Sequence, residues 1–235
     1  MAFNYSPKVV TNGLVLYLDA ANTKSYVSGS TTWSDISRSG NNGTLTNGPG
    51  YNSANGGSIV FDGANDYFIL NNNIGISGSS PRTISCWFNP NNTNIGSQAI
   101  FSYGTDTTLA IFSVNINTTT SGNIYLYFNT RDYQTGASTI TSNSWYNLVM
   151  TYNSGPIETL GSISLYLNGQ NIAITSVGTG NGVLNTSNTK FYIGSNLGTS
   201  FFYNGKIGQV SVYNRVLSAT EVLQNYNATR TRFGR

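Results

Sequence analysis

Histidine is absent from this 235-residue chain, and cysteine occurs once. Catalysis through a serine–histidine pair is therefore excluded, and so are zinc sites built from histidines or paired cysteines. An intrachain disulfide is excluded as well. The single cysteine, Cys86, stands in the alternating stretch RTISCWF, which points it to the same side as Ile84 and Phe88. We expect a buried free thiol.

Charge is also sparse. Charged residues make up 8% of the chain, far below the roughly 25% of an average soluble domain. Amide, hydroxyl and tyrosine side chains take their place, a composition typical of extracellular β-proteins, lectins and virion components. The net charge of +3 is too small to indicate a nucleic-acid partner. No hydrophobic run is long enough to cross a membrane.

The two ends of the chain differ from its middle. The opening stretch MAFNYSPKVV lacks the apolar segment of a signal peptide, so we expect a protein that is made in the cytoplasm of its host and is located in the virion. We assign residues 1–12 to an N-terminal arm. No acid follows Glu221, and three arginines close the chain. We expect residues 230–235 to form a solvated basic tail.

Alternation of apolar and polar residues dominates the sequence, and clusters of glycine, asparagine, serine and proline separate the alternating runs. Many short strands at regular spacing predict an all-β antiparallel sandwich or barrel in one domain. Asn168 and Gly169 stand between two runs, as a type I′ hairpin turn requires. The expected strands are 13–19, 58–62, 66–70, 82–89, 98–103, 108–116, 122–129, 144–152, 162–167, 171–176, 190–195 and 207–214.

Two segments depart from this pattern. Ser218 and Glu221 have the spacing of a capping box, and a short apolar stripe follows them, so one helix is expected after the last strand. Residues 20–57 are polar, rich in glycine and asparagine, and weakly periodic. They predict a long irregular loop pinned by Trp33.

The motifs follow one another in the order GLVLYLDAANTKSY, TTWSDISRSGNNGTLTNGP, GGSIVFDGANDYF, RTISCWFNP, WYNLVMTYN, ISLYLNGQ, FYIGSN and GKIGQVSVYNRVLSATEVLQNYNATRTRFG. This ordered set resembles the laminin-G-like jelly rolls of the concanavalin A-like lectin/glucanase superfamily. It is most similar to stand-alone versions carried by tailed phages, including cyanophages. The resemblance covers residues 13–229. It implies two curved antiparallel sheets, one short C-terminal helix, binding of sugars or proteins, and calcium in some members.

Glucanases of that superfamily carry their catalytic acids on one strand, as Glu-x-Asp-x-Glu or a close variant. This chain has two glutamates, Glu158 in a Gly/Pro turn and Glu221 in the expected helix cap. No expected strand carries two acids on one face. Because glycoside hydrolysis needs two positioned carboxylates, the sequence predicts a protein that is not an enzyme.

Asp62 and Asp66 flank a turn in SIVFDGANDYFIL and have two interpretations. With carbonyls of the turn they would supply part of a calcium shell. As turn residues, they would instead accept hydrogen bonds from local backbone amides and close a hairpin. Strands on both sides favour the hairpin, so we assign no metal or other cofactor, and calcium stays an alternative. Asp19 and Asp35 are expected to cap loops or pair with an arginine.

Tyrosine recurs on the side of four expected strands that faces away from the apolar positions. Flat rings beside hydroxyls and amides suit sugars, but tyrosine is also favoured in strands and at subunit interfaces. We therefore predict one ligand or interface face. It is carried by Tyr125, Tyr127, Tyr166, Tyr192 and Tyr213.

Together these features predict a non-enzymatic structural or display protein of a tailed-phage virion, on its head or tail. It is expected to dock to other virion subunits, to form a homo-oligomer and to touch host surface glycans, without nucleic acid and without membrane insertion. A free calcium-dependent lectin is the alternative. A glycoside hydrolase ranks third.

Overall fold

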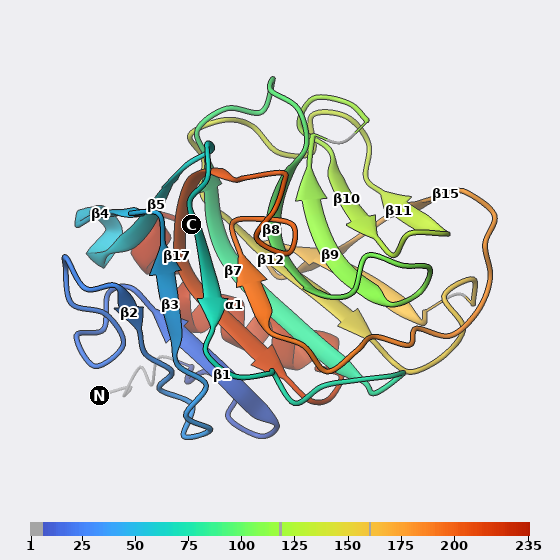
Figure 1. Ribbon diagram of the computed structural model, residues 1–235, viewed down its shortest axis with the longest axis horizontal. Coiled ribbons are helices and arrows are strands. Elements are labelled where there is room, and N and C mark those ends of the chain that lie inside the picture. The colour runs from blue at the N-terminus through green and yellow to red at the C-terminus, as the bar shows by residue number, and fades with distance from the viewer. Residues whose placement is uncertain (1–6, 118, 160) are drawn as a thin grey trace, which may run out of the picture.

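The computed structural model describes residues 7–117, 119–159 and 161–235. Its strands form two antiparallel sheets that pack face to face, with one short helix near the C-terminus (Figure 1). The predicted all-β jelly-roll sandwich with a single C-terminal helix is therefore confirmed.

The eight-stranded sheet has β7 (Arg82–Pro90) and β17 (Asn204–Tyr213) at its centre, and β1 (Leu14–Asp19) pairs with β17 beside the main path. Every pairing in it is antiparallel. In spatial order the strands of the main path are β14 (Gln170–Ile172), β13 (Ile163–Leu167), β12 (Tyr146–Tyr152), β7, β17, β5 (Ser58–Asp62) and β4 (Gly50–Asn52).

The nine-stranded sheet lies in front of the other in Figure 1 and is also antiparallel throughout. Its centre is formed by β8 and β9. In spatial order its strands are β15 (Thr175–Val177), β11 (Asp132–Gln134), β10 (Ile124–Tyr127), β9 (Ile111–Ile116), β8 (Gln98–Gly104), β16 (Phe191–Ile193), β6 (Tyr67–Leu70), β3 (Gly43–Thr46) and β2 (Thr32–Trp33).

The core fills the space between the sheets. Strand alternation turns every second side chain inward, so Ile84, Cys86 and Phe88 of β7 meet Phe112 and Val114 of β9 in one buried cluster. The buried free thiol predicted for Cys86 is confirmed. Burial raises the pKa of this thiol, so the thiolate that reacts with electrophiles is disfavoured.

The helix α1 (Ala219–Thr229) covers the outer face of the eight-stranded sheet. Ser218 and Glu221 form the predicted capping box. Val222 packs with Val149 and Tyr213 in a small second cluster beneath the helix. No helix among the residues described here has the length and hydrophobicity that a membrane span needs.

The C-terminal segment corrects the sequence analysis, which expected residues 230–235 to be a solvated tail. Residues Arg230–Phe233 form a 3-10 helix, η2, and Phe233 is buried against Trp87 and Trp145. Arg232 forms an ion pair with Asp19. A run of arginines suggested exposure, but each arginine has an aliphatic stem, and the phenylalanine among them supplies the hydrophobic anchor.

The segment 20–57 is a second correction, because it is not one irregular loop. It contributes β2 and β3 to the nine-stranded sheet and β4 to the other, together with the 3-10 turn η1 (Ala54–Gly56). These strands are only two to four residues long, too short for alternation to show. Trp33 is fully buried and packs edge-on against Phe68, as the expected pin.

The expected strand 171–176 is divided between the two sheets. Ile172 pairs with Leu165 in the eight-stranded sheet, whereas Thr175 pairs with Gln134 in the nine-stranded sheet. The chain therefore crosses from one sheet to the other at residues 173–174. A continuous alternating run does not record such a crossing. The predicted Asn168-Gly169 hairpin joins β13 and β14, and both turn residues have positive φ, of 52° and 78°.

Candidate functional site

The five tyrosines predicted to share a face lie on two different sheets. Tyr125 and Tyr127 of β10 and Tyr192 of β16 project from the outer face of the nine-stranded sheet. Tyr166 and Tyr213 belong to β13 and β17 of the other sheet and pack in the cluster beneath α1. The alternation assigned each tyrosine to the side away from the core, but it carried no information about which sheet a strand joins.

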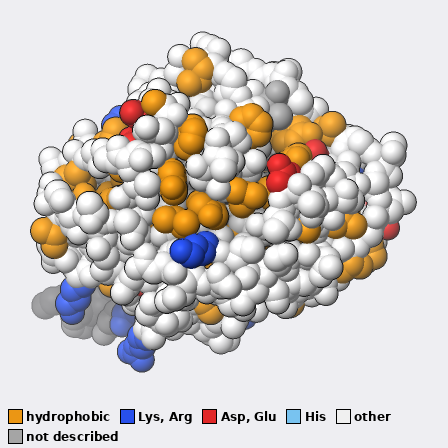
Figure 2. Space-filling model, viewed as in Figure 1, with side chains coloured by type: hydrophobic (Ala, Val, Ile, Leu, Met, Phe, Trp, Pro, Cys, Tyr) orange, Lys and Arg blue, Asp and Glu red, His pale blue; other side chains and the backbone are white. Residues whose placement is uncertain are grey.

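Strand register aligns one row of side chains across the outer face of the nine-stranded sheet. Two tyrosines stand in this row with small hydroxyl side chains between them. In spatial order it reads Tyr127, Ser113, Ser102, Tyr192, Ile69 and Thr44. We call the surface around this row the tyrosine face, and define it by Tyr67, Tyr125, Tyr127 and Tyr192. Figure 2 shows hydrophobic side chains gathered in a hollow on this side of the molecule, with basic and acidic groups at different borders.

The loop 194–203 lies across the middle of the tyrosine face and holds it. The Ser102 hydroxyl donates to the carbonyl of Ser195 at 2.9 Å and accepts from the amide of Leu197 at 2.9 Å. The amide of Ala99 donates to the Phe201 carbonyl at 2.7 Å. Because these bonds tie the loop to a central strand, the surface beside Tyr192 is fixed by the fold itself.

One end of the tyrosine face is acidic. The Tyr127 hydroxyl donates to Oδ1 of Asp106 at 2.9 Å, and Nδ2 of Asn129 donates to the same oxygen at 3.1 Å. Two residues earlier on β10, the Tyr125 hydroxyl donates to Oδ2 of Asp132 at 2.9 Å. Each tyrosine therefore has its own carboxylate partner, one exposed and one buried.

Burial first, and the two carboxylates second, disfavour ionisation of these phenols. Burial and the hydrogen bond to Asp106 raise the pKa of Tyr127 to about 12. Burial and Asp132 raise the pKa of Tyr125 further. Burial also raises the pKa of Asp132, although the Phe128 amide and the Tyr125 hydroxyl oppose this rise by bonding the charged form. Both phenols stay protonated, and both protons are directed at carboxylates.

The sequence analysis missed Asp106, Asn129 and Asp132. They lie in the loop before β9, in the turn after β10 and in the first position of β11. None has a motif around it, and Asp106 meets Asn129 only because β9 and β10 pair. The one local signal is the turn itself, where Asn129 has a φ of 58°, a left-handed conformation that asparagine tolerates.

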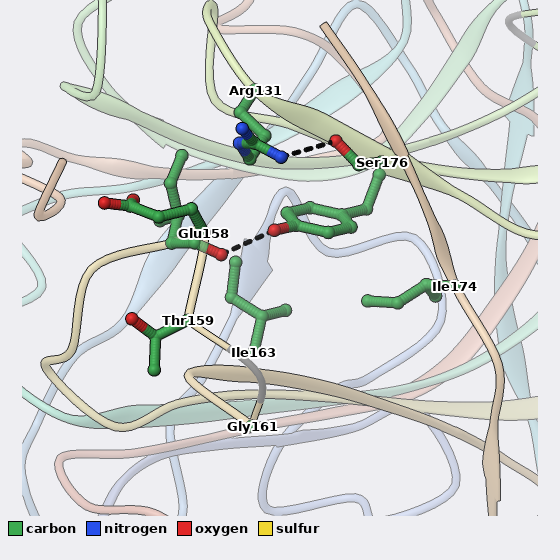
Figure 3. Close-up of a pocket in the computed structure, with 9 residues that line it drawn as sticks. Arg131, Glu158, Thr159, Gly161, Ile163, Ile174 and Ser176 are labelled. Atoms are coloured by element: carbon green, nitrogen blue, oxygen red, sulfur yellow. Dashed lines mark hydrogen bonds between the residues drawn. The ribbon is translucent and has the colours of Figure 1, made fainter. Parts of the chain in front are cut away.

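A pocket of about 230 Å³ opens on the opposite side of β11, at the edge of the sandwich. Figure 3 shows Arg131 and Ser176 on one side of it and Ile163 and Ile174 on the other. Arg131 donates from Nη1 to the Ser176 hydroxyl at 3.0 Å and from Nε to the carbonyl of Gly180 at 2.7 Å. Its guanidinium thus holds the 178–182 loop against the sheet.

The other polar groups of this pocket are engaged as well. The Tyr133 hydroxyl donates to the Ile157 carbonyl at 2.5 Å. Glu158 accepts from the amide of Gly182 at 2.9 Å, and this bond lowers its pKa. Since the polar groups bond mainly to the protein and isoleucines form the floor, the pocket has the chemistry of a structural crevice at a loop closure.

The four other aspartates considered from the sequence serve local structure. Asp62 accepts from the amide of Ala64 at 2.7 Å, and Asp66 accepts from the amide of Asp62 at 3.1 Å. These local turn contacts were predicted, but the predicted hairpin is wrong. The turn joins the two sheets, since β5 pairs with β4 and β17 in one sheet and β6 pairs with β3 and β16 in the other. Asp35 accepts from the amides of Tyr17 and Ser37, and Asp19 caps Ala21 and pairs with Arg232. Within the described ranges, no three acidic or cysteine side chains come together as metal ligands.

The geometry defines a class of protein: a two-sheet jelly roll whose broad face carries ordered tyrosines and polar partners. The Laminin_G_3 family model, described as the concanavalin A-like lectin/glucanases superfamily, matches residues 62–223. The chain belongs to this family. The superfamily holds sugar-binding proteins and enzymes alike, so membership fixes the fold and leaves the activity open.

Solved structures resemble the chain in fold at low sequence identity. Domain 4 of AbnA, an extracellular arabinanase of Geobacillus stearothermophilus solved with arabinotriose, has a TM-score of 0.64 at 19% identity, covering 91% of this chain and 98% of that one. The binding domain of Paraclostridial Mosquitocidal Protein 1 has a TM-score of 0.67 at 19% identity, covering 93% and 52%. Trypanosoma rangeli sialidase with sialic acid has a TM-score of 0.66 at 14% identity, covering 94% and 33%.

The chain spans about half the length of several of the chains that it matches, and about a third of the sialidase. No curated protein matches its sequence.

Proposed function

We propose that this protein is a non-enzymatic binding domain that recognises glycans on its tyrosine face. The observation that carries the proposal is the aligned row in which Tyr127 and Tyr192 flank two serines. The two serine hydroxyls are buried and bonded within the protein. The tyrosine rings therefore supply the stacking surfaces, and Asp106 and Asn129 beside Tyr127 supply the open hydrogen-bonding groups, all ordered by the fold before a ligand arrives.

The carboxylates near this face support binding rather than hydrolysis. A glycosidase needs one carboxyl group free to protonate the leaving oxygen and another free to act on the sugar or on water. Asp132 is buried, and its two oxygens accept from the Phe128 amide and the Tyr125 hydroxyl. Asp106 is left as the open carboxylate of the pair. A general acid and a base are therefore not both accessible here.

We propose further that the domain is displayed on a tailed-phage virion. It would be attached to other virion subunits in symmetric copies and would contact glycans of the host surface. The low charge, the amide- and hydroxyl-rich surface and the resemblance of the ordered motifs to stand-alone phage domains support this placement. Repetition of weak sites would raise avidity without any new contact.

An oligosaccharide array tests the binding role. We expect the protein to bind glycans, Tyr127→Ala to lose that binding, and Tyr166→Ala to keep it, because Tyr166 lies on the other sheet beneath α1. Equal loss in both variants, or no binding by the parent protein, would contradict the proposal. Mass spectrometry of purified particles tests the placement separately: we expect the protein in the particles, and its absence there would refute the virion role alone.

A further inference from the structure

The geometry points to Asp106 as the residue that makes the tyrosine face select uncharged, hydroxyl-rich glycans and reject acidic ones. This inference rests on the proposed glycan binding and specifies its ligand class.

Most donors at this end are already used, and Asn129 keeps one amide proton. The Tyr127 hydroxyl proton and an amide proton of Asn129 both go to Oδ1 of Asp106, and the Tyr125 proton goes to Asp132. Neither Oδ2 of Asp106 nor Oδ1 of Asn129 accepts a hydrogen bond from any residue that the structure describes. What remains open beside the Tyr127 ring is two acceptors and a single amide donor, so acceptors predominate.

A ligand that meets open acceptors must supply donors. Sugar hydroxyls do so, and a bond to a carboxylate is stronger than a bond to a neutral group. A carboxylate or sulfate on the sugar has no proton to give near neutral pH and would be repelled by Asp106. Asp106 therefore attracts uncharged, hydroxyl-rich glycans and repels acidic ones, and specificity needs both effects.

Two cations directly precede strands of this sheet, Arg131 before β11 and Lys190 before β16. Arg131 belongs to the opposite side of β11, where its guanidinium is held by Gly180, Ser176 and Asn181. Lys190 is exposed and lies two residues before Tyr192, directly ahead of β16. The structure gives Lys190 no ion pair with Asp106, and of these two described residues Asp106 is the one that forms a hydrogen bond with a tyrosine of the face.

The test compares affinities for one set of uncharged oligosaccharides and for the same set with the primary hydroxyl oxidised to a carboxylate, by calorimetry. We expect the parent protein to bind the uncharged set at least tenfold more tightly. Asp106→Asn should weaken that binding about tenfold, since it replaces a charged acceptor by a neutral one, and should narrow the discrimination against the acidic set. Asp62→Asn removes the same charge at a turn between other strands and should change neither affinity.

Each other outcome is decisive. Equal or tighter binding of the acidic set would overturn the inference while leaving glycan binding intact. If Lys190→Gln then lost binding of the acidic set, recognition would be assigned to the Lys190 border of the face. An Asp106→Asn protein that is folded by circular dichroism and binds both sets as the parent does would also overturn it. If neither set binds the parent, the proposed function itself fails.

Discussion

The rings of Trp87 and Phe233 stack with their centroids 4.2 Å apart and their planes 15° apart. Trp87 lies on the outer face of β7, and Phe233 belongs to η2, near the C-terminus. A Cβ atom on Gly208 would lie 2.7 Å from the Phe233 ring, so glycine is needed there for the close approach. The last residues are therefore part of the packed structure.

Replacing Phe233 should be costly for this reason. We expect Phe233→Ala to lower the free energy of unfolding by about 3–5 kcal/mol, the usual cost of truncating a buried aromatic side chain. The exposed neighbour Thr231 is the control, and Thr231→Ala should stay within about 0.5 kcal/mol of the parent. Urea denaturation of both variants measures this. Equal stability of the two would mean that the segment is loose in solution.

Arg82 gives a second prediction, because it is a fully buried cation that forms no ion pair with a described residue. Its guanidinium donates to the carbonyls of Ser80 and Gly78 and to the hydroxyls of Thr186 and Tyr103. The planar fork matches several acceptors at once, and an ammonium group cannot.

We therefore expect Arg82→Lys to destabilise the protein by about 3 kcal/mol or more, since buried acceptors left unpaired cost about 1–3 kcal/mol each. The same substitution at the exposed Arg230 should cost no more than about 0.5 kcal/mol. Thermal melts of the two variants compare them directly. A small effect at Arg82 would show that lysine reaches the same carbonyls or that water replaces the lost donors.

Periodicity predicted the core well because burial between two sheets selects every second residue. Ile124, Leu126 and Phe128 are buried, as the alternation of that strand required. It failed for the outer faces, because what covers a face comes from distant parts of the chain. Tyr213 lies under α1 and Ser102 lies under the 194–203 loop, and no local pattern records either cover.

The candidate site was predictable only in part. The tyrosines were visible in the sequence as a recurring residue type on strands. Their partners Asp106 and Asp132 were not, because each stands alone in a polar stretch and gains its meaning from strand pairing. The solvated-tail prediction failed for a similar reason: Phe233 is one apolar residue among arginines, and its partner Trp87 is far away in sequence.

Glu221 predicts a dependence of stability on pH. Its carboxylate binds Arg215 through both oxygens, which lowers its pKa from the usual value near 4.3 to about 2. A carboxyl group with a lowered folded-state pKa contributes stability that is fully present above its ordinary pKa. That contribution is lost as the pH falls through the folded-state pKa. The pair is partly exposed, so its worth is about 1 kcal/mol or less.

The stability gap between the parent protein and Glu221→Gln measures this contribution. We expect the gap to be constant between pH 7 and about pH 5 and to shrink steadily toward pH 2, near the folded-state pKa of Glu221. Thr220→Ala is the control, because Thr220 is exposed, stands next to Glu221 and carries no titratable group. A gap that stays the same at pH 2.5 would show that the carboxylate charge does not matter and that only the cap geometry does.

Tyr125 and Tyr127 offer a matched pair on one strand, because both donate to an aspartate from the same face. They differ in burial: Tyr125 is 7% exposed and bonds the buried Asp132, whereas Asp106 is open to water. Removing the hydroxyl of Tyr125 leaves a buried oxygen of Asp132 without its hydrogen-bond donor. Removing the hydroxyl of Tyr127 lets water replace it at Asp106. We expect Tyr125→Phe to cost about 1–3 kcal/mol and Tyr127→Phe about 0.5 kcal/mol or less. Urea denaturation at neutral pH ranks them. Equal costs would mean that both carboxylates are equally shielded, in which case Asp106 could not serve as an open acceptor for a sugar.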